Sequence, residues 1–179
     1  MVKKFFTSDM HLGHANILKF KSKDGTLVRP GFKDVTHMNE TIISNYNSVV
    51  GFDDIVYNLG DVTWSEKDLE QYMPRLNGRK ILIPGNHDLL PAKIYLKYFD
   101  DVVGSRKIKH NHKWFIISHY PIHFDCNHPE EIFNVHGHTH EKAVITDHYE
   151  DYRYFNVGVE RNNYTPVLID DIIKKMPGW

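Results

Sequence analysis

Histidine is frequent in this chain, and several of the histidines stand beside aspartate, asparagine or glycine. The sequence has 179 residues, of which 13 are histidines. Histidine is the side chain that proteins use most for binding metals and for moving protons near neutral pH. Five segments gather such side chains: SDMHLGH, LGDVTW, PGNHD, ISHYP and HGHTH. The candidate chemical groups in these segments are Asp9, His11, Asp61, Asn86, His87, His119, His138 and His140.

These candidates offer oxygen and imidazole nitrogen but no sulfur. That combination favours a divalent ion such as manganese, iron, cobalt or zinc over a thiolate-rich structural zinc, and it is too rich in nitrogen for calcium. The candidates outnumber the ligands that one tetrahedral or octahedral ion needs once water is counted. Two cations are therefore expected, with a shared carboxylate holding them roughly 3.5–4 Å apart.

Each of the five segments follows an apolar stretch that is typical of a β-strand. In the first half of the chain, strands are predicted over residues 3–9, 54–61 and 79–88. Two amphipathic helices are predicted between them, one from an N-cap at Thr36 to a stop at Gly51, and one opening at Ser65. The order β-α-β-α-β is typical of a sheet of parallel strands covered by helices.

Ligands of open α/β sheets bind beyond the carboxyl ends of the strands, so the five segments are expected to converge in space. Alternating positions, as in Asp9 with His11, send both side chains to one face of an extended segment. Glycines inside these segments would let the backbone turn sharply and come close to a bound ion. These glycines are Gly60, Gly85 and Gly137.

The second half of the chain is richer in predicted strands. A short helix is expected after Pro91, and strands over residues 101–121 are expected to turn around Asn111. A buried strand over 132–140 runs into a polar loop, two further strands are expected within 142–160, and a last helix is expected through Ile169, Ile172, Ile173 and Met176. No repeat or linker interrupts this order, so residues 1–179 are predicted to form one α/β domain.

Composition narrows the classes of function. The 22 basic and 23 acidic side chains give a net charge of -1, which argues against nucleic-acid binding through a broad positive surface but leaves room for a local positive site. The single cysteine, Cys126, has no internal partner for a disulfide, which fits a reducing cytoplasm. Because no apolar stretch is long enough to cross a bilayer, a protein that is neither exported nor embedded in a membrane is expected.

The motifs DMH, GD, GNHD, H and GHTH, in this order, resemble those of the calcineurin-like metallophosphoesterases. The segments SDMHLGHANI and NVGVE are similar to those of the small single-domain bacterial and phage members. The resemblance implies an α/β fold of the metallophosphoesterase type, a four-layer sandwich of two mixed β-sheets flanked by helices. It also implies two divalent metal ions, with Mn²⁺ favoured over Fe, Zn, Co or Ni.

The resemblance assigns roles residue by residue. One ion would be bound by Asp9, His11 and His140, and the other by Asn86, His119 and His138. Asp61 would bridge the two ions, which would lower the pKa of a bridging water and so supply hydroxide near neutral pH. His87 would protonate the leaving oxygen or stabilise its charge, and Asp88 would orient His87.

Three further residues are predicted to contact the substrate. His14 and Asn16 follow the first ligand pair closely, and the resemblance places a histidine here in small members; a loop-stabilising role for His14 is the alternative. Arg29 has a planar fork of donors that suits a phosphate, although an ordinary surface role is open too. His136 would lie on the same face as His138, and a structural role is favoured for it over direct support of the metals.

The predicted function is that of a dinuclear-metal phosphoesterase that hydrolyses phosphodiester bonds of a small nucleotide or a related substrate. Phosphomonoesterase and nuclease are the alternatives within the same fold, and a noncatalytic binding module organised by metals is a more remote one. The near-neutral charge favours a small phosphoester, nucleotide-like in kind, over long nucleic acid, and no membrane partner is expected.

Overall fold

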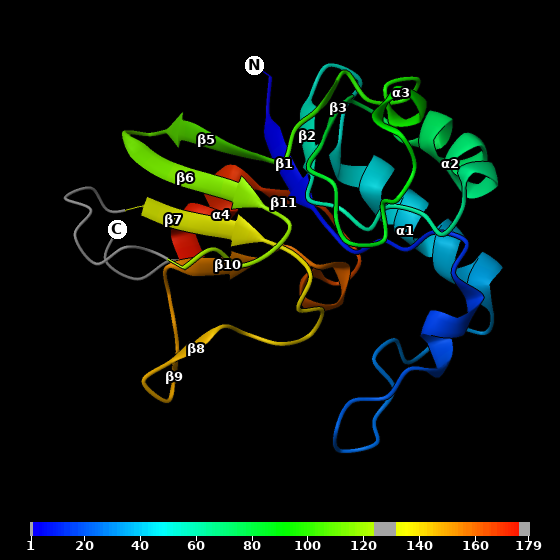
Figure 1. Cartoon of the computed structure of the whole chain (residues 1–179), viewed down its shortest axis with the longest axis horizontal. Coiled ribbons are helices and arrows are strands. Elements are labelled where there is room, and N and C mark those ends of the chain that lie inside the picture. Colours follow the sequence, from blue (N-terminus) through cyan, green and yellow to red (C-terminus); the bar gives the residue numbers. More distant parts are fainter. Residues whose placement is uncertain (1, 124–131, 176–179) are drawn as a thin grey trace.

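The computed structural model describes residues 2–123 and 132–175, and its main feature is a pair of β-sheets that share one core (Figure 1). Helices flank the sheets, as Figure 1 shows most clearly for the first sheet. The predicted α/β sandwich of two mixed sheets flanked by helices is confirmed. Cys126 and Met176 lie outside the described residues.

The first sheet has the strand order β11-β1-β2-β3-β4. Its strands are β1 (Lys4–Thr7), β2 (Ile55–Asn58), β3 (Arg79–Leu82), β4 (Asp101–Val102) and β11 (Val167–Leu168). Strands β1 to β4 are parallel and β11 pairs antiparallel with β1, so the predicted parallel arrangement is correct for the first half of the chain. The carboxyl ends of β1, β2 and β3 therefore open at one edge of the sheet.

Both faces of this sheet are buried, which explains why its strands read as continuous apolar runs rather than alternating ones. In β1, Phe5 packs with the core beneath the helices, whereas Phe6 points into the core between the two sheets. Figure 1 shows helices along the outer face of this sheet. They are α1 (Val35–Val49), α2 (Glu66–Tyr72) and α3 (Ala92–Tyr95).

The first of the two predicted N-caps is wrong and the second is confirmed. The N-cap of α1 is Asp34 rather than Thr36, because the Asp34 carboxylate accepts a hydrogen bond of 2.8 Å from the backbone N–H of His37. Ser65 caps α2 as predicted. The chain then tightens into a 3₁₀ turn, η2 (Met73–Arg75), at Pro74.

The second sheet has the order β10-β7-β6-β5, and β6, β7 and β10 are parallel. Its strands are β5 (Ser105–His110), β6 (Lys113–Ser118), β7 (Ile132–His136) and β10 (Tyr154–Asn156). The predicted turn at Asn111 is confirmed: Asn111 and His112 join antiparallel β5 and β6 with left-handed φ values of 47° and 65°, the conformation of a type I′ hairpin.

Short elements complete the chain. The predicted strands within 142–160 are β10 and a small hairpin of β8 (Ile145–Thr146) and β9 (Tyr149–Glu150). The last helix is α4 (Ile169–Lys175), whose Ile169 and Ile172 enter the core between the sheets. Two 3₁₀ helices, η1 (Ala15–Lys19) and η3 (Val159–Asn162), were not predicted. Within the described residues, no helix combines the length and apolarity that a membrane span requires.

Candidate metal centre

The predicted ligands lie just beyond the ends of strands from both sheets. Asp9 and His11 follow β1, Asp61 follows β2 and Asn86 follows β3. From the second sheet, His119 follows β6, and His138 and His140 follow β7. The two sheets thus contribute to one polar centre, as the strand-end argument predicts.

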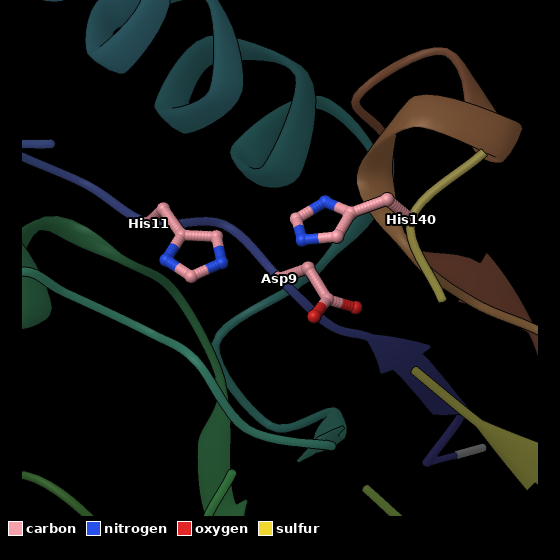
Figure 2. Close-up of side chains that lie close together, drawn as sticks. All are labelled: Asp9, His11 and His140. Atoms are coloured by element: carbon pink, nitrogen blue, oxygen red, sulfur yellow. The ribbon is translucent and has the colours of Figure 1, made fainter. Parts of the chain in front are cut away.

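One group of ligands comprises Asp9, His11 and His140, each of which offers an atom within 4.8 Å of those of the others. Figure 2 shows the Asp9 carboxylate and the two imidazoles close together, with His140 reaching in from a different segment. Both ring nitrogens of His11 are buried, and neither has a hydrogen-bond partner among residues 2–123 and 132–175. Because a buried polar atom without a partner is costly, a metal ion at this position would satisfy a ligand that the protein itself does not.

A second group of ligands meets at Asn86. The Oδ1 atom of Asn86 lies 3.0 Å from Nε2 of His119 and 2.9 Å from Nδ1 of His138. One amide oxygen and two imidazole nitrogens therefore point at a common centre. The oxygen and nitrogen donors of both groups fit the borderline divalent ions that the sequence predicts.

Asp61 lies between the two groups. Its Oδ2 atom is 3.5 Å from Nε2 of His11 and 3.7 Å from Nε2 of His119, so a single carboxylate oxygen faces one ligand of each group. The other oxygen, Oδ1, accepts a hydrogen bond of 2.9 Å from the backbone N–H of His87. This arrangement has the form of a carboxylate shared by two metal ions.

Hydrogen bonds set the tautomers of two of the histidines. Nδ1 of His119 lies 2.7 Å from the carbonyl oxygen of Leu59, and Nδ1 of His140 lies 2.9 Å from Oε1 of Glu160. Since each Nδ1–H donates to an oxygen acceptor, Nε2 is left with its lone pair toward the centre. Glu160 belongs to the NVGVE segment, but its contact with a ligand was not predicted from the sequence.

Burial and charge move the pKa values of the ligands in different directions. Burial raises the pKa of Asp9 to about 6, and burial together with the nearby Arg29 charge lowers the pKa of His11 well below its usual value. Burial also acts to lower the pKa of His140, but the hydrogen bond and charge of Glu160 outweigh it and raise that pKa. Without metal, Asp9 and His140 therefore hold protons more readily than ordinary side chains, and His11 does not.

The backbone at the centre is unusual as well. Left-handed φ values of 48° to 67° occur at five of the predicted ligands, namely Asp9, His11, Asp61, His138 and His140. Such conformations are costly for residues with a Cβ, and they gather at functional sites where the surrounding structure enforces them. Gly137 allows the loop after β7 to approach β1, because a Cβ at this position would lie 1.9 Å from Oγ of Ser8.

Arg29 does not occupy the position expected of a phosphate clamp. Its side chain is 1% exposed and forms an ion pair with Glu160, at 2.7 Å between Nη2 and Oε1. It also donates hydrogen bonds to the carbonyl oxygens of Asp9 and Met10. The prediction of substrate contact for Arg29 is wrong. Its donors bind the backbone at Asp9 and the carboxylate of Glu160, which in turn pairs with His140.

In the part of the chain that the structure describes, the Asp88 carboxylate forms no hydrogen bond with the His87 ring. This carboxylate accepts backbone hydrogen bonds from Asp61 at 2.7 Å, Val62 at 3.2 Å and Gly85 at 2.8 Å. The predicted orienting role is thus corrected: Asp88 ties the loop after β2 to the loop after β3. His87 itself is exposed, and its ring centroid lies 5.4 Å from that of His11.

A cleft of about 420 Å³ opens beside the first group of ligands. Two of the predicted substrate residues, His14 and Asn16, line it, together with His87. The cleft also has an aromatic wall that the sequence did not predict, formed by Phe20 and Trp64. By contrast, His136 is buried, and its Nδ1 atom lies 2.8 Å from the carbonyl oxygen of Gly137. This contact agrees with the structural role favoured for His136.

The family model of the calcineurin-like phosphoesterases matches residues 3–175. The chain belongs to this family. Calcineurin-like phosphoesterases are metal-dependent hydrolases of phosphoesters, and Asp9, His11 and His140 form a group that could hold a metal ion in this member.

Similar proteins occur in archaea, phages and bacteria. The uncharacterized protein MJ1445 of Methanocaldococcus jannaschii is 34% identical over 189 residues, which cover 97% of this chain and 91% of that protein. The Gene 66 protein of Mycobacterium phage L5 is 27% identical and covers 89% of this chain and 87% of its own length. The crystal structure of AQ665 from Aquifex aeolicus, a protein of unknown function, has a TM-score of 0.76 at 30% identity and covers 97% of this chain and 99% of its own. AQ665 therefore shares the fold of this chain over nearly its whole length.

Proposed function

We propose that this calcineurin-like phosphoesterase is a dinuclear-metal phosphodiesterase that hydrolyses a small nucleotide or a related diester. The observation that carries the proposal is the position of Asp61, whose Oδ2 atom faces His11 on one side and His119 on the other. Two ligand groups joined by one carboxylate are the arrangement that two-metal hydrolysis requires.

Mn²⁺ is the proposed metal, and Fe, Zn, Co or Ni would suit the same donors. A reducing cytoplasm is the proposed location, on the basis of the single cysteine.

The protein would hold the first ion with Asp9, His11 and His140, and the second with Asn86, His119 and His138. When bound, the pair of ions lowers the pKa of a water molecule and neutralises charge on the phosphoryl oxygens. The Glu160 and Leu59 acceptors keep His140 and His119 in the tautomers that ligation needs.

His87 is the proposed proton donor to the departing oxygen. It is exposed in the cleft, and its backbone N–H is tied to Oδ1 of Asp61, so its position is set relative to the proposed shared ligand. A proton from His87 would neutralise the alkoxide as the ester bond breaks. His14 and Asn16 line the same cleft and are the proposed contacts for the substrate.

The proposed size of the substrate rests on the cleft beside the predicted ligands. Its volume of about 420 Å³ falls in the range of small-molecule sites and leaves room for a substituent on the phosphate beyond the metals. A substrate panel would separate this proposal from a monoesterase or a nuclease. It would contain a nucleotide monoester, a cyclic and a linear nucleotide diester, and a short single-stranded oligonucleotide.

The decisive test compares Asp61→Asn with Asp53→Asn. Asp53 is an exposed aspartate in the turn before β2, at the opposite end of the strand from the ligands. Loss of a group that only hydrogen-bonds to a metal ligand typically lowers metal affinity or activity about 10–100-fold. Loss of the shared ligand itself should therefore lower kcat/KM for diesters by at least about a hundredfold. Asp53→Asn should behave like the parent. Equal activity of the two variants at full metal occupancy of the parent would refute the proposal.

A further inference from the structure

Two large aromatic side chains stand exposed in the cleft beside the first group of predicted ligands, although such groups are normally buried. Trp64 is 52% exposed and Phe20 is 49% exposed, and both line the cleft that contains His11, His140 and His87. Trp64 comes from the loop after β2, and Phe20 directly follows η1. Residues far apart in sequence thus form one aromatic wall.

This wall is held in place rather than loosely attached. The indole of Trp64 stacks on the imidazole of His14, with ring centroids 3.8 Å apart and an interplanar angle of 11°. Phe20 meets the same imidazole edge-on, at 5.6 Å. His14 is itself buried, and the backbone N–H of Trp64 donates to the carbonyl oxygen of Leu12. One face of the indole is therefore covered by His14, while Trp64 remains half exposed and lines the cleft.

We infer that this wall is a stacking subsite for the base of a nucleoside, and that the nucleoside is the leaving group of the diester. The inference rests on the proposed function and names the part of the substrate that the site recognises. A nucleobase combines a flat aromatic face with a polar edge, and stacking on aromatic side chains is the general way in which proteins bind unpaired bases.

The polar groups of the cleft favour a base over other substituents. Asn16 and Lys19 line the same cleft as Trp64, and the Lys19 ammonium donates a hydrogen bond of 3.4 Å to Oδ1 of Asn16. The remaining donors of these two side chains suit the edge of a base. A quaternary ammonium headgroup could also stack on an indole. However, Lys19 and two divalent ions would repel such a cation, whereas a neutral base is free of this repulsion.

The position of the wall relative to His87 selects the leaving group. The ring centroids of Trp64 and His87 are 6.1 Å apart, so the wall lies on the side of the proposed proton donor. Water would supply the hydroxyl that bonds to phosphorus, and the bond from phosphorus to the nucleoside oxygen would break. The electron pair stays on that oxygen, which takes its proton from His87. The products are a free nucleoside and a phosphate monoester of the other alcohol.

The methyl diester of adenosine 5′-monophosphate tests this directionality, because its two ester bonds give different products. Cleavage on the nucleoside side yields adenosine and methyl phosphate, whereas cleavage on the other side yields adenosine 5′-monophosphate and methanol. Adenosine is expected to exceed adenosine 5′-monophosphate by about tenfold or more, measured by chromatography of the products. A predominance of adenosine 5′-monophosphate would overturn the assignment of the leaving group.

Variants of Trp64 test the stacking itself. Replacing one aromatic side chain that stacks on a base by alanine typically weakens binding of that base roughly tenfold to hundredfold. Trp64→Ala should lower kcat/KM for the adenosine diester at least about tenfold more than for glycerophosphoethanolamine, a diester without an aromatic group. Trp64→Phe should retain most of the preference. Phe52→Ala removes an aromatic side chain that is 82% exposed in the turn before β2, and it should match the parent. Equal losses on both diesters would mean that Trp64 acts only by packing on His14.

A binding measurement separates failure of the subsite from failure of the proposed function. Equilibrium dialysis of adenosine 5′-monophosphate with the metal-loaded protein requires no turnover. Trp64→Ala should weaken this binding about tenfold, and Phe52→Ala should leave it unchanged. If no diester is hydrolysed but this difference in binding is seen, the proposed phosphodiesterase activity fails and the stacking subsite stands. Identical binding by the parent and Trp64→Ala would overturn the subsite.

Discussion

At the scale of single residues, protonation and metal binding compete at Asp9 and His140. The pKa of Asp9 is raised to about 6 by burial, and the pKa of His140 is raised because Glu160 outweighs the effect of burial. Each must lose its proton before it can bind a cation. His11, whose pKa is lowered by burial, is already neutral and ready to bind near pH 7.

Metal binding should therefore release more protons at pH 6.0 than at pH 8.0. Asp9, with a pKa of about 6, and His140, whose pKa is raised, should both contribute to the additional protons at the lower pH. Calorimetric titration of the chelator-treated protein with Mn²⁺, repeated in buffers of different ionisation enthalpy, measures this number. Glu160→Gln removes the group that raises the pKa of His140 and should reduce the release at pH 6.0. A release that does not change between the two pH values would contradict the assignment of these ligands.

The role of His87 depends on the alcohol that departs. Its side chain reaches into the cleft, while its backbone N–H, which alanine retains, donates to Asp61. His87→Ala should slow an alkyl diester about 10²-fold or more, because an alkoxide needs a proton as it leaves. A p-nitrophenyl diester should slow much less, since its leaving group is stable as an anion. Steady-state kinetics on both substrates at equal metal content would reveal the difference, and equal slowing would rule out proton donation.

At the scale of elements, the loops after the strands carry the strain of the site. Among the ligands with left-handed φ, His138 has a φ of 67° in the loop that follows β7. A Cβ in this conformation costs roughly 1–2 kcal/mol, which glycine avoids. The rigid strands on both sides, rather than the local preference of each residue, must hold the ligands in position.

Glycine at position 138 should accordingly leave the protein more stable to unfolding than alanine does. In chelator-treated protein, His138→Gly should unfold with a free energy about 1 kcal/mol higher than His138→Ala, although both lose the imidazole. The same pair at Glu70, an exposed position in α2, should show the opposite order, because glycine weakens a helix. Urea unfolding followed by circular dichroism measures both differences. A preference for alanine at position 138 would show that its backbone is not strained.

The same loops explain which features could be predicted from the sequence. Asp9, His119 and His138 could be predicted to lie in one region because each follows an apolar strand, and ligands of α/β sheets bind beyond the carboxyl ends of the strands. Arg29 and Asp88 were misassigned because spacing does not show that a side chain will be buried among backbone acceptors or donors.

Features made by distant or very short segments were missed. The aromatic wall joins Phe20 to Trp64 across the sequence, and no local pattern marks either residue as part of a cleft. Strand β11 has only the two residues Val167–Leu168, too few for an alternating pattern to be visible. Tertiary packing, rather than local preference, defines both features.

At the scale of the whole molecule, the centre joins the two sheets. Asp9 and Asp61 follow strands of the first sheet, and His119 and His140 follow strands of the second. In the absence of cations, the neighbouring carboxylates of Asp9 and Asp61 and the strained loops at this junction oppose folding. For Asp9, whose folded pKa is raised, the stabilising effect of protonation is complete below its unfolded pKa and is lost as the pH rises through about 6.

Divalent metal should therefore stabilise the whole fold, and more at high pH than at low pH. Ions at a hundred times their Kd stabilise the folded state by about 2.7 kcal/mol, which corresponds to roughly 5–10 °C in Tm for a chain of this size. Calorimetric scans of chelator-treated protein with and without Mn²⁺ should show this shift at pH 8.0 and a smaller one at pH 6.0, where Asp9 and His140 still hold protons. Asp61→Asn should lose most of the shift and Asp53→Asn none of it, because only Asp61 lies between the two ligand groups. The same Tm with and without metal at pH 8.0 would mean that the strand-end groups do not bind cations as one centre.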